Sequence, residues 1–536
     1  MNHTFLLSLV TFLPLVFAAV VLLLPRENAK AVRTTALAGT LATLAVSLVI
    51  WSQFDLNNSG AFQMLEHHEW VKSFGINYFV GIDGISLLLT IMTTAIFPFA
   101  VGVSFSGITD RTNQFYAWLL IMETAVLGVF LSINMVMFYV FWEAMLVPMF
   151  FIMGIWGGPR RVYATVKFFI YTMVGSMVML VSILAMYFMT GQQTFDFPAI
   201  LASMPAVLAK YHGQYGSDFV EILLFIGFFL AFGIKSPVWP FHSWVPDAYA
   251  EAPTGGSIIL VALKMGLYGF IRFCLPLFPN AVHDCAPWIV VLSVIGVVYS
   301  ALVAAMQTDL KRLIAYSSIS HVGVIMLAIF AATSIGINGA VLQMVSHTIT
   351  TGALFIIVGG LIARRGSSQI ADFGGLMKMM PGFTAIFLIA TLSSVALPLT
   401  AGFSGEILML IGSFQKYPVA TGIATTSAVW SVVYMLWMFQ RVMYGPITND
   451  RVKSFHDTTL GEYWALAPLV LAIFALGVFP AISTSRTAGA ATVVLATYHN
   501  GLNPENGGKA VETALAPVPQ GYVSAVASAA PLKGNR

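Results

Sequence analysis

The chain has 536 residues, of which 58% are hydrophobic and 9% are charged, and its formal net charge is +3. An ordinary soluble protein carries roughly a quarter charged residues, so this composition excludes a water-soluble globular fold. The two cysteines, Cys274 and Cys285, exclude an iron–sulfur ligand set and a disulfide framework, because either needs four or more cysteines at characteristic spacings.

Long apolar segments follow one another from residues 5–25 to residues 462–483. A membrane-spanning helix needs about 20 mainly apolar residues, and we count fourteen segments that meet this requirement. The first segment is not expected to be a cleaved signal peptide, because no positive residue precedes it and its apolar run is too long. The sequence therefore predicts an all-α polytopic membrane protein with about fourteen transmembrane helices.

Lysine and arginine are distributed unevenly between alternate loops. The loops after spans 1, 3, 5, 9, 11 and 13 hold fifteen of them, and the opposite loops hold only four, which are Lys72, Lys210, Arg272 and Lys416. Loops rich in these residues stay on the inner side of a membrane. We therefore expect both termini to face the outer side.

The segments between and after the spans are short or polar. Residues 52–77 and 191–218 are predicted outer loops, too small for a catalytic domain, and no strand periodicity is apparent in the chain. Gly336 and Gly339 join two helices rather than a strand and a helix, so no nucleotide site is expected. From about residue 487 the chain is rich in Ala, Pro, Gly, Asn and Ser, which predicts a disordered tail.

These features predict a simple domain order. The first three spans occupy residues 1–113, spans 4–8 occupy 114–277, spans 9–13 occupy 287–442, span 14 occupies 462–484, and the disordered outer tail occupies 485–536.

Ionisable residues inside the spans are the most informative feature of the sequence. Each costs about 2.5 to 3.5 kcal/mol even on the lenient insertion scale, so it must face the bundle interior or water and is functional by default. We find seven such residues: Glu123, Glu143, Lys235, Lys264, His321, His347 and Glu406.

Two of these charges lie beside predicted helix interruptions. Lys235 in the seventh span is followed by Pro237 and Pro240, and proline breaks or kinks a helix. In the twelfth span, helix-weakening residues precede Glu406, namely Ser393, Ser394, Pro398, Gly402 and Gly405. Two interrupted helices five spans apart predict inverted repeats with an ion path at mid-membrane.

Neutral polar residues form stripes on the same helices. Gln343, His347 and Thr351 lie four residues apart, and so do Ser317 and His321, and Lys264 and Tyr268. Such stripes can hold a file of water, and water and imidazole both accept and donate protons. The pattern therefore indicates a proton path.

Structural explanations remain open for several of these residues. A buried Glu143–Lys235 pair could merely fasten two helices, Glu123 could bond a neighbouring hydroxyl, and the two span histidines could be packed core residues. The adjacent His67 and His68 resemble a metal pair but lack supporting ligands, so no metal site is expected.

Four motifs resemble a known family. They are FYVFWEAMLVPMFFIMGIWGG around Glu143, GIKSPVWPFHSWVPDAYAEAPTGGS at 233–257, SHTITTGALF at 346–355 and GFSGE at 402–406. Over roughly residues 1–485 the chain is similar to the antiporter-like membrane subunits of proton-pumping NADH:quinone oxidoreductase, respiratory complex I. Within that family it most resembles the chain M (subunit 4) group, because Glu406 stands where chains L and N usually have lysine.

The resemblance implies two inverted five-helix repeats, helices 4–8 and 9–13, with helices 7 and 12 interrupted. It implies that Glu143 pairs with Lys235, that Lys264 bridges two half-channels, and that Glu406 leads to the outer side. His321 and His347 would lie on the connecting hydrated axis. Glu123, His242 and Tyr268 are further candidates for accessory roles.

The resemblance also implies a function. We expect a translocase subunit that moves protons from the cytoplasm to the periplasmic side of a bacterial inner membrane. Electron transfer in partner subunits, which would hold the flavin, iron–sulfur clusters and quinone, would supply the energy, and no cofactor is expected in this chain. The expected contacts are lipid and the neighbouring chains L and N, with no nucleic acid. The alternatives are a subunit of a multisubunit sodium/proton antiporter, a membrane-bound hydrogenase subunit, and a purely structural scaffold.

Overall fold

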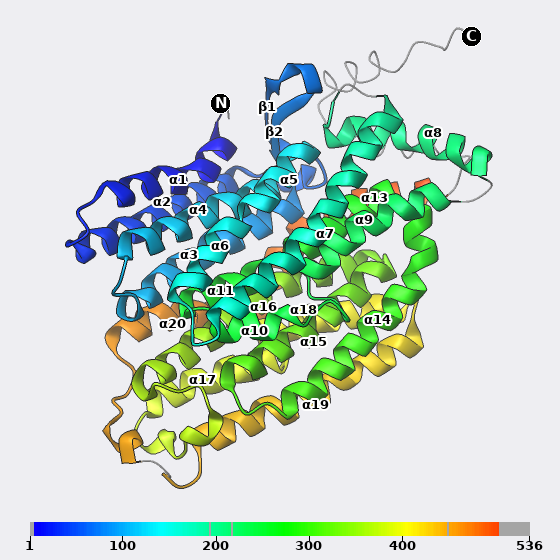
Figure 1. The fold of residues 1–536 in the computed structure, drawn as a ribbon. Helices are drawn as coiled ribbons and strands as arrows, with labels where there is room; N and C mark the ends of the chain where they lie inside the picture. The colour runs from blue at the N-terminus through cyan, green and yellow to red at the C-terminus, as the bar shows by residue number, and fades with distance from the viewer. Residues whose placement is uncertain (1–4, 192–193, 216–217, 448–449, 503–536) are drawn as a thin grey trace.

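The structure is a computed structural model that describes residues 5–191, 194–215, 218–447 and 450–502. Figure 1 shows long helices packed side by side along a common direction, with a small β-hairpin at one end of the bundle. The helices of the bundle are α1 (Leu6–Leu23), α2 (Ala29–Gln53), α3 (Gly84–Gly107), α4 (Thr112–Leu131), α5 (Met135–Ala144), α6 (Leu146–Trp156), α7 (Arg161–Thr190), α9 (Phe219–Lys235), α10 (Trp244–Glu251), α11 (Thr254–Ala262), α12 (Met265–Gly269), the π-helical turn η3 (Phe270–Cys274), α13 (Leu275–Leu277), α14 (Pro279–Ala305), α15 (Leu310–Ala331), α16 (Ser334–Arg365), α17 (Pro381–Ser394), α18 (Ala401–Phe414), α19 (Pro418–Met443) and α20 (Leu460–Val478).

The helices confirm the predicted fold class. Among the described residues, twelve helical stretches are long and apolar enough to cross a membrane, and α17 and α18 are shorter apolar helices. The chain is therefore a polytopic helical membrane protein. The count of fourteen spans and the inverted repeats stay predictions.

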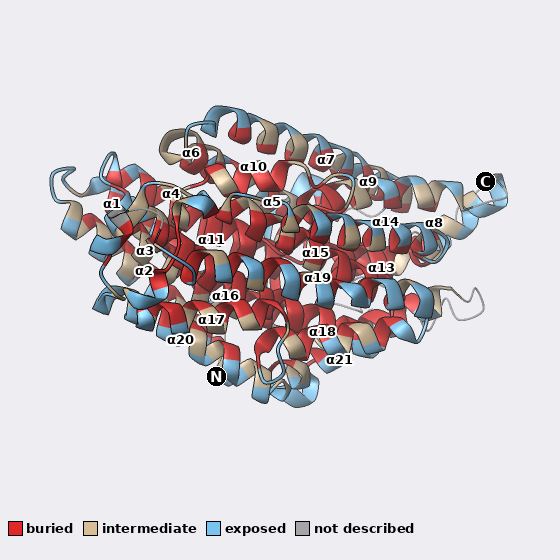
Figure 2. Cartoon of the chain, turned by 90° about the horizontal axis from the view of Figure 1, so that it is seen from below, coloured by how far each residue is buried: buried red, intermediate tan, exposed pale blue. Residues whose placement is uncertain are grey.

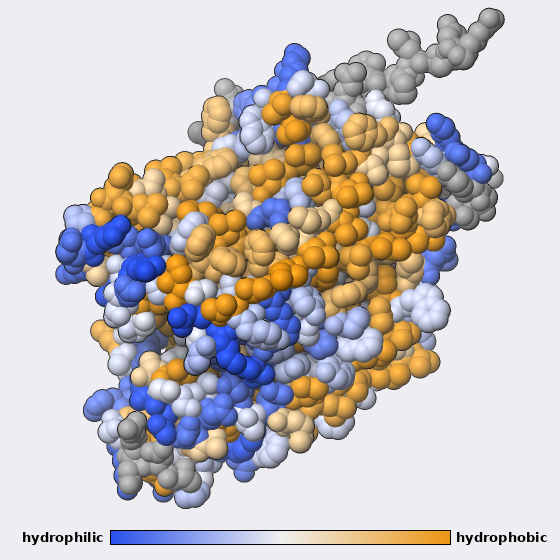
Figure 3. Space-filling model, viewed as in Figure 1, coloured by the Kyte–Doolittle hydropathy of each residue, from blue (hydrophilic) through white to orange (hydrophobic). Residues whose placement is uncertain are grey.

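Burial is concentrated at the centre of the bundle. Figure 2 shows buried residues through the middle of the bundle and exposed residues around its outside. Figure 3 shows that much of this outer surface is hydrophobic, with hydrophilic side chains gathered mainly at the lower left of the view. An apolar perimeter of this kind suits contact with lipid. The side chains of Lys235, Lys264, His347 and Glu406 are buried inside the bundle.

The seventh and twelfth predicted spans are interrupted where their sequences predict. Helix α9 ends at Lys235 and α10 begins at Trp244, with Pro237 and Pro240 between them. Helix α17 ends at Ser394 and α18 begins at Ala401, and Ala396 and Leu399 between them have positive φ angles of 55° and 74°. Backbone groups beside both charges are thus freed from helical hydrogen bonding.

Two more spans are interrupted that the sequence did not predict. Helix α5 ends before Met145, because Pro148 has no N–H to bond the Ala144 carbonyl and its ring clashes there. Helix α11 ends at Ala262 and α12 begins at Met265, so Lys264 lies between two helices.

The predicted absence of strands is wrong, and both of the long polar segments contain regular structure. The segment 52–77 and the residues after it contain an antiparallel pair of strands, β1 (Gln63–Val71) and β2 (Ile76–Ile82), and the segment 191–218 contains helix α8 (Phe197–Tyr215). Gly75, with a φ of 65°, makes the hairpin turn, and β2 is mostly buried against the bundle, which stabilises the pair.

The predicted tail from residue 485 also begins too early. Residues Ala481–Gly501 form helix α21, and the predicted disorder of residues 503–536 lies outside the described residues. Small residues let α21 approach the chain closely, because a Cβ on Gly60 would lie 3.0 Å from the Gly489 carbonyl oxygen. Packing against other elements therefore stabilises a helix that its own composition does not favour.

Candidate functional site

Lys235 is the last residue of α9 and only 4% exposed. Its Nζ lies 2.7 Å from the Sδ of Met145 and 4.9 Å from the centre of the Trp142 ring. Met145 is the residue at which the fifth span is interrupted. The interruption between α5 and α6 therefore places the Met145 sulfur beside the ammonium of Lys235 at the end of α9.

The two glutamates of the first half have few polar contacts. Glu143 in α5 is half-buried, and its Oε1 has no hydrogen-bond partner in the described part of the chain. Glu123 in α4 is fully buried, and the described residues offer neither of its carboxylate oxygens a hydrogen bond. Glu143 and Lys235, both described, form no ion pair here, and the ammonium contacts Met145 instead.

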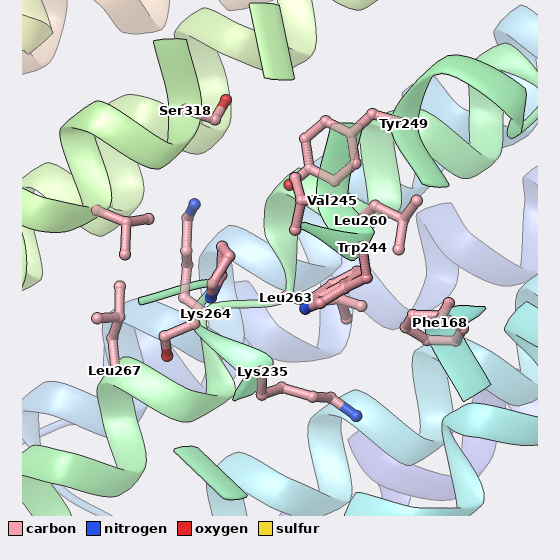
Figure 4. A pocket seen from close by; sticks show the side chains of 13 residues that line it. Phe168, Lys235, Trp244, Val245, Tyr249, Leu260, Leu263, Lys264, Leu267 and Ser318 are labelled. Atoms are coloured by element: carbon pink, nitrogen blue, oxygen red, sulfur yellow. The ribbon is translucent and has the colours of Figure 1, made fainter. Parts of the chain in front are cut away.

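A cavity of about 20 Å³ connects the surroundings of Lys235 and Lys264. Its lining includes the polar side chains of the two lysines, Ser236, Ser318 and Tyr249, with apolar residues such as Leu260 and Leu263 around them. The volume suffices for one water molecule, which needs two to four polar partners. Figure 4 shows the two ammonium groups pointing away from each other, with that of Lys264 on the side of Ser318.

Lys264 links the first half of the chain to the second. It is 5% exposed, and its Nζ lies 3.2 Å from Nδ1 of His347 in α16. Just after the interruption at Lys264, the backbone packs closely on α9. A Cβ on Gly266 would lie 2.5 Å from the Phe232 carbonyl oxygen in that helix.

Two histidines continue from Lys264. The rings of His347 and His321 are 5.5 Å apart between centroids and nearly perpendicular, and Nε2 of His347 lies 3.5 Å from the Thr351 hydroxyl. His321 also interacts with the backbone of Ser394, at the end of α17. The histidines thus connect Lys264 to the interruption that precedes Glu406.

Glu406 lies in the first half of α18 and is 5% exposed. Its neighbour Gly405 packs directly on α16, since a Cβ there would lie 2.9 Å from the Cα of Gln343. Tyr434 lies near this carboxyl, and its hydroxyl donates to Ser317 in α15 over 3.0 Å. Tyr434 thus lies between Glu406 and Ser317 of the polar stripe predicted on α15.

The accessory candidates differ in their surroundings. His242 lies between α9 and α10 with its Nδ1 buried and, within the described residues, unbonded, and its ring is 5.4 Å from that of Tyr299. Tyr268 is fully buried, donates to the Phe130 carbonyl oxygen over 3.1 Å and accepts from Arg272. The described residues contain no group of three or more His, Cys, Asp or Glu side chains that could hold a metal.

Sequence reasoning missed a polar cluster at the other end of the first half. Asp247 in α10 accepts from Lys167 over 2.9 Å and from Arg312 over 2.8 Å, which joins α7, α10 and α15. Four residues later, Glu251 accepts from the Arg160 backbone over 2.9 Å. The signal was present as two carboxylates four residues apart in the quoted motif PDAYAEAP.

A family sequence model described as the transmembrane region of NADH:quinone oxidoreductase and Mrp antiporters matches residues 132–431. The chain belongs to this family. Subunit M of NADH-quinone oxidoreductase from Rhodobacter capsulatus is 40% identical over 506 residues, covering 92% of this chain and 97% of that one. Subunit M from Rickettsia prowazekii is 39% identical over 479 residues, covering 88% and 95% of the two chains.

Solved structures agree. A chain of respiratory complex I from Thermus thermophilus matches with a TM-score of 0.81 and 29% identity over 91% of this chain and 99% of that chain. A chain of the Mrp complex from Dietzia matches with a TM-score of 0.76, over 90% of this chain and 52% of that chain, but its identity of 20% shows the shared fold alone.

These matches decide between the expected functions. The subunit M relatives make this chain a proton-translocating membrane subunit of NADH-quinone oxidoreductase, and the sodium/proton antiporter alternative is not favoured. The chain is a multi-pass membrane protein of a bacterial multisubunit complex.

Proposed function

We propose that Glu143, Lys235, Lys264, His347, His321 and Glu406 form one path that moves protons from the inner to the outer side of the membrane. The observation that carries this proposal is the contact between Lys264 and His347, because it joins a lysine of the first half to an imidazole of the second. Both groups are buried, and both can donate and accept a proton.

The path begins at Glu143, where a neighbouring subunit would contact this chain. Glu143 lies between Val140 and Val147, which are 44% and 45% exposed, so a partner chain can approach this part of α5 and α6. A charge arriving there changes the balance between two arrangements. In the closed one Glu143 and Lys235 form an ion pair, and in the open one Lys235 contacts Met145 instead. An ammonium that loses its carboxylate neighbour is less stable in the protonated form, which favours release of its proton.

Release then continues through the cavity. The two ammonium groups point apart and do not pass a proton directly to each other. A water molecule in the cavity would carry the proton from Lys235 to Lys264. Lys264 donates to Nδ1 of His347, and the second histidine continues towards Glu406. Against a potential of about 100 mV each proton costs about 2.3 kcal/mol, which a nearby charge can supply.

The remaining parts of this function lie in other subunits and in the orientation of the chain. Chains L and N are the proposed neighbours, and partner subunits hold the flavin, iron–sulfur clusters and quinone. The uneven distribution of lysine and arginine supports termini on the periplasmic side. A tag at the C-terminus should be accessible to a reagent that cannot cross the inner membrane, and protection of the tag would contradict this orientation.

The Lys264→Ala variant tests the path. In the complete complex reconstituted in vesicles, it should abolish proton pumping while a complex of the full size, with this chain present, is still recovered on a native gel. Lys210→Ala, at an exposed lysine of α8, is the matched control and should pump normally. Normal pumping by Lys264→Ala would refute the proposal.

A further inference from the structure

A second polar stripe leads away from Lys264 along its own span. Lys264, Tyr268 and Arg272 follow one another at intervals of four residues, and all three are buried, with exposures of 5%, 1% and 6%. Arg272 lies in the π-helical turn η3, and such turns often occur at functional sites. The stripe ends at Asp83, which precedes α3 and follows the β-hairpin.

Three groups of this stripe, Tyr268, Arg272 and Asp83, are joined by hydrogen bonds. Nη2 of Arg272 donates to Oδ2 of Asp83 over 2.5 Å, and its Nε donates to the Tyr268 hydroxyl over 3.1 Å. The Tyr268 hydroxyl donates its own proton to the Phe130 carbonyl oxygen. Asp83 also accepts from the backbone N–H groups of Ile85 and Ser86, so the pair is fixed to the start of α3.

A guanidinium is the least suitable group for passing a proton. Its proton is not released in proteins, and a fixed positive charge in a narrow, poorly solvated passage repels an approaching proton. The rings of Phe62 and Tyr268 lie 4.9 and 5.3 Å from the Arg272 guanidinium carbon, which holds the cation in place. A buried ion pair gives little net stability compared with apolar packing, so stability alone does not explain it.

We propose that the Arg272–Asp83 pair closes the outer end of the first half to protons and so directs the proton of Lys264 sideways to His347. Without this closure, the stripe of Lys264 and Tyr268 would offer a shorter way out that bypasses Glu406. Arg272 is a positioning residue in this scheme, because it acts on the route and not on the transfer itself. The inference rests on the proposed function of Lys264.

Passive proton leak tests this inference. Vesicles that contain the complete complex are given a pH gradient without NADH, and the decay of the gradient is measured. Arg272→Gln removes the fixed charge and should accelerate the decay about tenfold, while electron transfer to an artificial acceptor is unchanged. Arg272→Lys keeps a positive charge beside Asp83 and should restore a tight membrane, a rescue that a purely structural role does not require.

Two further variants make the result decisive. Asp83→Asn combined with Arg272→Gln removes the pair without leaving a buried unpaired carboxylate, so it guards against misfolding and should also leak. Adding Lys264→Ala to Arg272→Gln should stop the leak, because the stripe then lacks its inner end. Wild-type tightness in both charge-removal variants, or failure of both to assemble, would overturn the inference and leave the pair a structural tie.

The two proposals fail in different ways. The proposed path through Lys264 fails if the single Lys264→Ala variant still pumps, which requires NADH oxidation to be measured. The closure by Arg272 fails on passive leak alone, which requires no electron transfer.

Discussion

The ammonium of Lys235 contacts the thioether sulfur of Met145, 2.7 Å away, and not the carboxylate of Glu143 two residues earlier. The Trp142 ring contributes a cation–π contact of 4.9 Å. A weak acceptor and an aromatic face suit a cation that must leave easily, because neither holds it as strongly as a carboxylate would. These two contacts therefore hold the ammonium less strongly than an ion pair with Glu143 would.

Met145→Leu should shift Lys235 towards Glu143. The substitution keeps the side-chain volume and removes the sulfur acceptor, and such swaps usually cost less than about 1.5 kcal/mol in stability. Loss of a contact worth roughly 0.5–1.5 kcal/mol should slow coupled NADH oxidation by about two- to tenfold. Met149→Leu, at a fully buried methionine in α6, is the control, and equal rates in both variants would argue against a role for the sulfur.

Glu406→Gln should abolish proton pumping, because an amide of the same shape cannot bind and release a proton. Glu406→Lys restores an ionisable group and asks whether the acid itself is needed. Pumping in vesicles is the measurement, and Glu27→Gln, at an exposed glutamate between α1 and α2, is the control. Full pumping by Glu406→Gln would exclude Glu406 from the path.

Gly405→Ala should displace Glu406 without changing any charge. The new Cβ would lie 2.9 Å from the Cα of Gln343, so α18 must move away from α16, at a cost of about 1–3 kcal/mol. We expect less assembled complex on a native gel and slower pumping per complex. Gly422→Ala in α19 is the control, because its Cβ would meet no atom within 4 Å. Equal assembly and pumping of the two variants would mean that the helix contact tolerates the extra carbon.

Asp457 should anchor the start of α17 in a pH-dependent way. Partial burial opposes ionisation of this carboxyl, but hydrogen bonds from the backbone N–H groups of Phe383, Gly382 and Thr458 outweigh burial and hold its pKa below the usual value. Because the folded-state pKa is the lower one, the stabilisation is present above the ordinary aspartate pKa. It is lost as the pH falls through the folded-state value.

Hydrogen exchange of the amides of Gly382 and Phe383 measures this anchor. At about pH 7 the wild-type complex should protect them more than Asp457→Asn does, and the difference should shrink as the pH falls below the ordinary aspartate pKa of about 3.9. Asp55→Asn, at an exposed aspartate of the outer loop, should leave the two amides unchanged. A difference that persists at the acidic end would mean that the charge of Asp457 is not the cause.

The residues that the sequence could identify are those with a local cause. Charges in apolar segments and prolines beside Lys235 have the same meaning in any fold, so the ionisable candidates and two interruptions were predictable. The interruption at Lys264 was not, because no proline or glycine lies at the break itself. Close to it, Gly266 packs on α9, a contact between distant parts of the chain that no local pattern reveals.

The other errors have a similar origin. The strand pair, α8 and α21 are built from polar or small residues whose local pattern is weak, and contacts with the bundle stabilise them. The Arg272–Asp83 pair joins residues 189 positions apart, and Arg272 alone gave no sign of its partner. Asp247 needed both Lys167 and Arg312 to be placed before its role as a bridge was visible.

The interruption of the helix at Lys264 has a consequence for how fast this side chain can change direction. Because the backbone there belongs to neither α11 nor α12, the lysine can turn between its two neighbours by rotating its own side-chain bonds, and no helix has to unwind. Rotations of this kind are fast compared with the microsecond-to-millisecond motions of whole domains. Turning of the Lys264 side chain therefore does not depend on a slow rearrangement of either helix.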